Sequence, residues 1–173
     1  MPWTTIEDRG EVRWLTLSNP GRRNAVPPEG WEELGVVLDE FESSEARVLV
    51  IRGDGEDFCA GADLAPRQDG DLSLVSAHQR MKLVAATAQA LHELTKPTIA
   101  AVDGVAVGAG MNLALGCDVV LATRRARFAE IFVRRGLTVD FGGTWLLPRA
   151  VGTQRAKELV LSGRIVEADE AHR

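Results

Sequence analysis

The sequence predicts a single α/β domain in which buried parallel strands alternate with helices. Short apolar runs rich in branched residues, at 47–52, 98–102 and 118–123, are typical of buried parallel strands. Longer stretches with helical spacing separate them, so we expect connections that cross from each strand to the next. A chain of 173 residues, 45% of them hydrophobic, is long enough for one sizeable core. We therefore expect residues 1–173 to form one domain.

The N-terminal elements follow from alternation and helical spacing. The runs 4–8 and 12–17 alternate and flank Arg9-Gly10-Glu11, which predicts a β-hairpin. Pro27-Pro28-Glu29 then opens a helix. The apolar residues that keep helical spacing in it are Trp31, Leu34, Val37, Leu38 and Phe41.

Four further helical segments are predicted after residue 73. A helix over 74–94 ends at Lys96-Pro97, and a short one covers 109–115. Helix-like runs also follow Gly142-Gly143-Thr144 and Gly152-Thr153-Gln154. The apolar face expected for the first of these helices consists of Leu74, Met81, Val84, Ala88 and Leu91.

Composition excludes several classes of function. A net charge of −5 argues against a nucleic-acid surface, which needs concentrated Lys and Arg. The two cysteines and three histidines lie in unrelated segments, so we expect neither a disulfide framework nor a metal site. We see no signal peptide and no apolar run that could span a membrane. These observations favour a soluble, cytoplasmic protein without a membrane or nucleic-acid partner.

Two glycine-containing motifs, 57–64 and 103–112, carry most of the functional information. Each joins a predicted strand to a more helical segment through small residues, which leaves backbone N–H groups unshielded. Two such groups converging on one carbonyl oxygen form an oxyanion hole, which points to an enzyme acting on a thioester. The alternative is that the small residues only permit tight strand–helix packing. A nucleotide site at Gly108-Ala109-Gly110 is a weaker idea, because Leu113 occupies the third glycine position.

The ordered motifs resemble the crotonase superfamily, the enoyl-CoA hydratase/isomerase family. The resemblance implies an α/β spiral of ββα turns, with the backbone N–H groups of Ala60 and Ala109 polarising an acyl-CoA carbonyl. The matching stretches, which cover nearly the whole chain in family order, are Asn19-Pro20, Asn24-Ala25, Phe58-Cys59-Ala60-Gly61-Ala62-Asp63-Leu64, 108–115, Cys117-Asp118 and 140–149.

The resemblance also implies a path for coenzyme A, which enters as part of the substrate, so no separate cofactor is expected. Guanidinium groups at Arg22 and Arg23 suit its phosphates, although these arginines could also be simply solvated. The other positions expected along this path are Asn24, Ala25, Ala62, Asp63, Leu64, Gly108 and Gly110.

The acid/base positions depart from the family pattern. Similar hydratases use two glutamates, whose positions fall here on Asn112 and Phe132, and neither residue is a general base. Asp140 is the base we favour, because an aspartate at this position shuttles the proton in similar isomerases; capping of the next helix is its alternative role. Glu130 is a second candidate that requires a displaced loop. A pocket of Phe132, Phe141 and Trp145 around Asp140 would raise its pKa.

Double-bond isomerisation of an enoyl-CoA is therefore the favoured activity. Hydration of a 2-enoyl-CoA is the alternative within the same class, and a non-catalytic acyl-CoA-binding or assembly subunit is the alternative outside it. The resemblance implies a further C-terminal helical segment after position 173, so we expect this chain to be either a truncated product or a short variant whose site is more open. If that segment is not required, we expect a homotrimer or hexamer.

Overall fold

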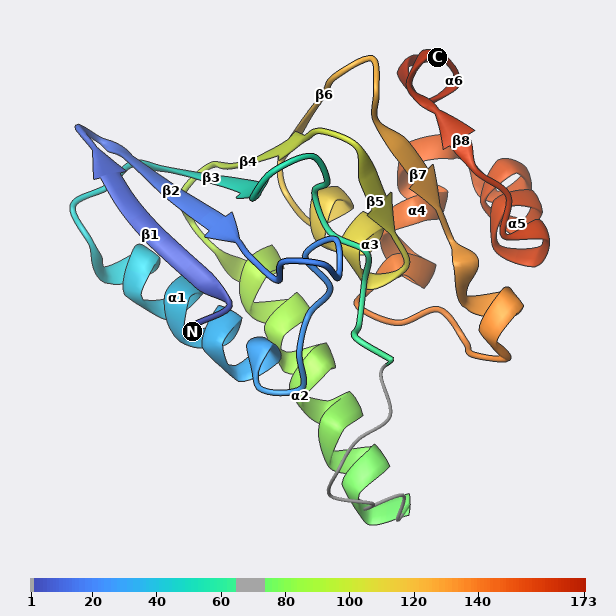
Figure 1. The fold of residues 1–173 in the computed structure, drawn as a ribbon, viewed down its shortest axis with the longest axis horizontal. Helices are drawn as coiled ribbons and strands as arrows, with labels where there is room; N and C mark the ends of the chain where they lie inside the picture. The colour runs from blue at the N-terminus through green and yellow to red at the C-terminus, as the bar shows by residue number, and fades with distance from the viewer. Residues whose placement is uncertain (1, 65–73) are drawn as a thin grey trace.

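The structure is a computed structural model that describes residues 2–64 and 74–173. Figure 1 shows two sheets, with strand orders β1-β2-β3-β4-β6 and β5-β7-β8. The elements are β1 Thr4–Arg9, β2 Val12–Leu17, α1 Gly30–Ser43, β3 Val48–Gly53, α2 Leu74–Glu93, β4 Thr98–Val102, β5 Val105–Val107, α3 Ala109–Leu115, β6 Val119–Ala122, β7 Arg127–Ala129, the 3-10 helix η1 Ile131–Arg135, α4 Gly143–Val151, α5 Thr153–Ser162, β8 Val166–Glu167 and α6 Ala168–His172.

The five-stranded sheet confirms the predicted strands and their direction. β1 and β2 pair antiparallel as the predicted hairpin, with Arg9 opposite Val12. The pairs β2–β3, β3–β4 and β4–β6 are all parallel. Parallel neighbours require crossover connections, and α1 and α2 supply two of them below the sheet (Figure 1). The predicted α/β layout is therefore correct.

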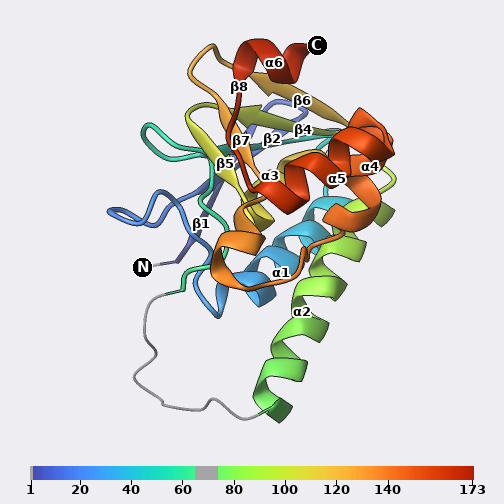
Figure 2. The same ribbon diagram turned by 90° about the vertical axis from the view of Figure 1, so that its right-hand side faces the viewer.

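Helix α1 buries the face that its spacing predicts: Trp31, Leu34, Val37, Leu38 and Phe41 are all buried. Helix α2 follows its prediction less closely. Val84 and Leu91 are buried, but Met81 is 45% exposed. The first half of α2 extends beyond the sheet and α1 (Figures 1 and 2), and Met81 belongs to this half of the helix.

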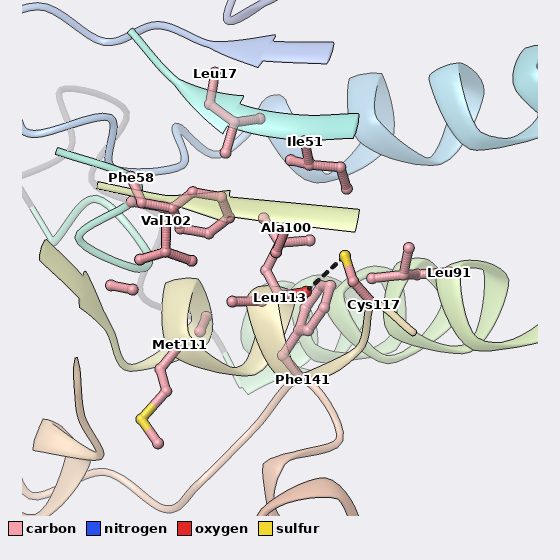
Figure 3. Close-up of a cluster of buried hydrophobic side chains, with 14 of the residues drawn as sticks. Leu17, Ile51, Phe58, Leu91, Ala100, Val102, Met111, Leu113, Cys117 and Phe141 are labelled. Carbon is pink, nitrogen blue, oxygen red and sulfur yellow. Dashed lines mark hydrogen bonds between the residues drawn. The ribbon is translucent and has the colours of Figure 1, made fainter. Parts of the chain in front are cut away.

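The core joins the large sheet to helix α3. Figure 3 shows side chains from β2, β3 and β4 facing α3 and the end of α2. Leu17, Ile51, Ala100 and Leu113 in this cluster are fully buried. The Cys117 thiol donates to the Leu113 carbonyl at the end of α3 (3.6 Å). Helix α3 is therefore anchored along its length, which fixes the position of its first residues.

The small sheet has no counterpart in the sequence prediction. β5 and β7 are three residues each and β8 is two. β5 pairs parallel with β7, and β7 pairs antiparallel with β8. Strands this short carry no measurable alternation, so only their partners define them. Within the ranges 2–64 and 74–173, no helix is long and apolar enough to cross a membrane.

Candidate active site

The two glycine-containing motifs lie against each other. Cys59 and Ala106 form an isolated parallel β-bridge. The Cys59 N–H donates to the Val105 carbonyl (2.9 Å), and the Val107 N–H donates to the Cys59 carbonyl (3.1 Å). The Asp57 side chain also accepts from the Val105 N–H (2.9 Å). Segments that are distant in the sequence therefore share one hydrogen-bonded backbone ladder.

Two glycines make this close approach possible. A Cβ on Gly110 would lie 2.2 Å from the Cys59 carbonyl oxygen, which no side chain tolerates. A Cβ on Gly61 would lie 2.8 Å from the Val107 carbonyl oxygen and 3.4 Å from the Ala109 nitrogen. Gly61 also has a φ of +83°, which glycine adopts readily. These two glycines therefore permit tight packing of the backbone. This packing brings the Gly61–Ala62 peptide beside Ala109, the first residue of α3.

The expectation for Ala60 is wrong. Its N–H donates to the Arg23 carbonyl (2.9 Å), so it is not free to bind a substrate oxygen. The N–H of Ala62, two residues later, and that of Ala109 donate to no acceptor within the described residues. The sequence signal that could have indicated this position is the glycine directly before Ala62, since Gly61 has the positive φ that glycine adopts readily. Ala109 stays a predicted donor.

Asn24 and Ala25 hold the loop from within. Asn24 is buried, and its amide donates to the backbone carbonyls of Asp54 (2.9 Å) and Asp57 (2.7 Å). Its φ is +57°, a left-handed conformation that asparagine adopts more readily than most residues. Ala25 is buried as well. Neither side chain is therefore exposed to contact coenzyme A directly, and their place in the predicted path stays a prediction.

Arg22 and Arg23 present their guanidinium groups at the surface. Arg22 Nε lies 3.8 Å from Asp63, and Arg23 Nε lies 3.6 Å from Asp57. More than half of each arginine side chain is exposed. Leu64 is also exposed, at the edge of the described segment. Each guanidinium group therefore lies near a carboxylate of the 57–64 motif while most of its side chain stays exposed.

Asp140 lies just upstream of helix α4, separated from Gly143 by Phe141 and Gly142, and its backbone carbonyl holds it there. Its carbonyl accepts from the Asn112 side-chain amide (3.0 Å) and from the Gly143 N–H (2.9 Å). The Asp140 side chain does not cap the helix, whose N-cap residue is Gly142. The capping alternative is therefore wrong. Burial raises the pKa of Asp140 to about 6, and its Oδ1 has no hydrogen-bond partner within the described chain.

Glu130 lies close to Asp140 and Asn112. It is fully buried at the junction of β7 and η1, and neither carboxyl oxygen has a hydrogen-bond partner in the described chain. Burial raises the pKa of Glu130 to about 7; the Asn112 amide opposes this rise and the charge of Asp140 adds to it. Asn112 is one turn along α3 from Ala109, so the carboxyl cluster and the predicted oxyanion donor share a helix.

A largely apolar cavity of about 440 Å³ adjoins Asp140. Phe141 and Trp145 line it, as the sequence predicts. Phe132 does not; its ring lies instead 3.7 Å from where a Cβ on Gly108 would be. The remaining wall comes mainly from α2, including Met81. Within the described ranges, this site included, no group of three or more His, Cys, Asp or Glu residues could hold a metal ion.

Comparison of the sequence with known protein families shows to which family the chain belongs. The family model for enoyl-CoA hydratase/isomerase matches residues 7–173. The chain belongs to this family. A probable enoyl-CoA hydratase of Mycobacterium leprae is 38% identical and aligns with 99% of this chain and 63% of that protein. A 1,2-epoxyphenylacetyl-CoA isomerase of Escherichia coli is 42% identical over 93% of this chain and 63% of that protein.

Solved structures of family members share the fold. An enoyl-CoA hydratase/isomerase of Cupriavidus metallidurans superposes with a TM-score of 0.90 at 39% identity, covering all of this chain and 65% of that one. A putative enoyl-CoA hydratase of Streptomyces coelicolor superposes with a TM-score of 0.92 at 35% identity. The match covers 99% of this chain and 64% of that one. The crotonase-like fold is confirmed. The chain spans less than two thirds of the length of these relatives.

Proposed function

We propose that this chain binds an acyl-CoA thioester and catalyses double-bond isomerisation of an enoyl-CoA, with Asp140 as the proton shuttle. The observation that carries the proposal is the Asp140 carboxyl group. It has an unpartnered oxygen, it adjoins an apolar cavity, and burial raises its pKa to about 6. A carboxyl base with a pKa near the working pH is the group that general-base catalysis needs.

In the proposed reaction, the Asp140 carboxylate removes a proton from C2 of a 3-enoyl-CoA. The electron pair of the C–H bond forms a double bond between C1 and C2 as the carbonyl electrons move onto the thioester oxygen, which gives a dienolate that still holds its double bond between C3 and C4. Asp140 then returns the same proton to C4, and the electrons settle as a conjugated double bond between C2 and C3. No atom is gained or lost, so one carboxyl group is sufficient.

The dienolate oxygen would accept hydrogen bonds from the backbone N–H groups of Ala62 and Ala109. Support comes from their lack of other acceptors in the described chain and from the packing of Gly61 against Ala109. One such donor typically contributes about 3–4 kcal/mol of transition-state stabilisation. Asn112, one turn further along α3, places Asp140 relative to these donors.

Coenzyme A would follow the loop that precedes α1 and the backbone of Ala62, Asp63 and Leu64. Arg22 and Arg23 would meet its phosphates, since guanidinium suits phosphate oxygens. Gly108 and Gly110 would allow the thioester to approach the backbone at the start of α3. The relatives named above carry CoA thioesters in their names, which supports this substrate class.

Hydration of a 2-enoyl-CoA is the second candidate, because Glu130 supplies a second carboxyl group near Asp140 with a pKa of about 7. A short-chain-enoyl-CoA hydratase of Clostridium acetobutylicum is 35% identical to this chain. Hydration requires both carboxyls to hold one water, whereas Glu130 is fully enclosed. Isomerisation needs only Asp140 and is therefore preferred over hydration and over a purely binding role.

The test offers the protein 3-enoyl-CoA and 2-enoyl-CoA separately and follows absorbance of the conjugated thioester. Isomerisation raises absorbance from 3-enoyl-CoA and leaves 2-enoyl-CoA unchanged. A loss of absorbance from 2-enoyl-CoA would establish hydration instead. Thioester binding without either change would favour the non-catalytic role.

Replacing the proton shuttle should separate binding from chemistry. We expect Asp140→Asn to lower kcat by about 10²- to 10⁴-fold, the usual contribution of a general base, with little change in thioester affinity. Calorimetric titration with a saturated acyl-CoA measures that affinity. The exposed Asp39→Asn on α1 is the matched control and should leave both quantities unchanged. Full activity in Asp140→Asn would exclude Asp140 as the base.

The proposal extends to a cytoplasmic homotrimer or hexamer. The free, buried thiols of Cys59 and Cys117 support a reducing compartment. The edge strand β6 exposes Val119, Val120 and Leu121, which supports coverage of this strand by another subunit or segment. Light scattering of the purified protein measures the assembly.

A further inference from the structure

Four buried polar atoms next to the proposed base have no hydrogen-bond partner in the described chain. They are Asn112 Oδ1, both carboxyl oxygens of Glu130 and Asp140 Oδ1. Buried polar groups are nearly always paired, so several unpaired oxygens in one place indicate a missing proton donor. A protonated carboxyl group is such a donor, and Glu130 is the fully buried member of the cluster.

The surroundings of Glu130 favour its uncharged form. Asn112 reaches it from α3, and Asp140 approaches it from the segment before α4. Asp140 adds negative charge, which opposes ionisation of Glu130. The nearest cations along its own element, Arg134 and Arg135 of η1, are exposed to solvent. An isolated charge in such a site is costly, and the group takes up a proton instead.

Asn112 lies near Glu130 and binds the backbone of Asp140. The Asn112 amide nitrogen donates to the Asp140 carbonyl (3.0 Å). Gly143 packs directly on the same amide: a Cβ there would lie 2.3–2.5 Å from its atoms. The amide therefore has little room to move, and it is both a neighbour of Glu130 and the group that holds the Asp140 carbonyl.

We propose that Glu130 is a positioning residue that stays protonated during turnover, holds the Asn112–Asp140 pair in place, and stops proton transfer when it ionises. This inference rests on the proposed isomerase function and adds its regulation by pH. Asp140 must be ionised to accept the substrate proton, while Glu130 must be neutral. Ionised Glu130 would place a second negative charge beside the forming dienolate. Isomerisation is therefore fastest in the narrow pH range in which Asp140 is already ionised and Glu130 is still protonated.

The first test is the pH dependence of kcat for 3-enoyl-CoA in the unmodified protein and in Glu130→Gln. We expect the unmodified protein to lose rate below about pH 6 and above about pH 7, about tenfold per pH unit on either side. Glu130→Gln is neutral at every pH and keeps a hydrogen-bond donor, so it should retain the acidic limb and lose the alkaline one. The exposed Glu40→Gln on α1 is the matched control and should keep both limbs.

An alkaline limb that persists unchanged in Glu130→Gln would overturn the proposal. Infrared difference spectroscopy of the unmodified protein gives an answer even if that variant folds poorly. We expect a protonated carboxyl band at pH 6 that disappears towards pH 9 and that remains in Asp140→Asn. If the only titrating band in this range is lost in Asp140→Asn, Glu130 is not protonated and the proposal fails. A protein without isomerase activity that shows the Glu130 band would contradict the proposed function and leave the protonation of Glu130 established.

Discussion

The Asn24 side chain stabilises the turn before the 57–64 motif. Its amide donates to the Asp54 and Asp57 carbonyls, which are the acceptors that shape the turn before the 57–64 motif. We expect Asn24→Asp to lower the free energy of unfolding by roughly 2–4 kcal/mol, because it removes two donors and places a carboxylate against two carbonyl oxygens. Denaturant unfolding measures the loss.

The control for this prediction is Asp54→Ala. Asn24 binds the backbone carbonyl of Asp54 and not its side chain, so this variant keeps the acceptor. It should change stability by less than about 1 kcal/mol. Equal losses in Asn24→Asp and Asp54→Ala would show that the amide is not the group that stabilises this turn.

At the scale of elements, helix α3 can contact the 57–64 motif only because Gly110 has no side chain. We expect Gly110→Ala to destabilise the protein by roughly 1–3 kcal/mol and to impair thioester binding, because its Cβ would meet the Cys59 carbonyl at 2.2 Å. Thermal unfolding and acyl-CoA titration together measure both effects.

Gly35 in α1 offers the matched control. It is also helical, but a Cβ there would meet nothing closer than the Thr87 hydroxyl at 3.8 Å. Gly35→Ala should therefore raise stability by about 0.5–1 kcal/mol, the usual gain for alanine in a helix. If Gly110→Ala and Gly35→Ala changed the free energy of unfolding in the same direction, the close approach at Gly110 would not be the cause of its effect.

Elements whose periodicity is long are the ones that sequence alone predicts well. The buried face of α1 and the strands β3, β4 and β6 follow directly from spacing and composition. The small sheet does not, because its strands are too short to show a period and exist only through pairing. The site divides in the same way. Asp140 can be identified from its motif, whereas the occupied N–H of Ala60 and the closeness of Glu130 to Asn112 depend on how distant segments pack.

For the whole molecule, the carboxyl cluster predicts an unusual dependence of stability on pH. Burial raises the pKa of Glu130 and of Asp140, so the folded chain binds protons more tightly than the unfolded chain. The free energy of unfolding should therefore rise as pH falls from about 8 to about 5, with roughly 1–3 kcal/mol from Glu130. Exposed acids such as Asp103, whose pKa a hydrogen bond from Arg125 lowers, act in the opposite sense only at lower pH.

Unfolding measured by urea at pH 5 and pH 8 tests this prediction. Glu130→Gln should gain stability at pH 8 and show a flatter dependence than the unmodified protein. A free energy of unfolding that falls steadily between pH 8 and pH 5 in the unmodified protein would contradict it.

The bridge between Cys59 and Ala106 has a consequence for how the protein matures. The proposed donors come together only after two distant stretches of chain have closed onto one ladder, and such non-local closure is slow to form. Under the proposed function, an acyl-CoA would therefore bind the fully folded chain alone. A ligand that binds only the folded state raises the free energy of unfolding, so added acyl-CoA would protect the finished molecule from unfolding and proteolysis.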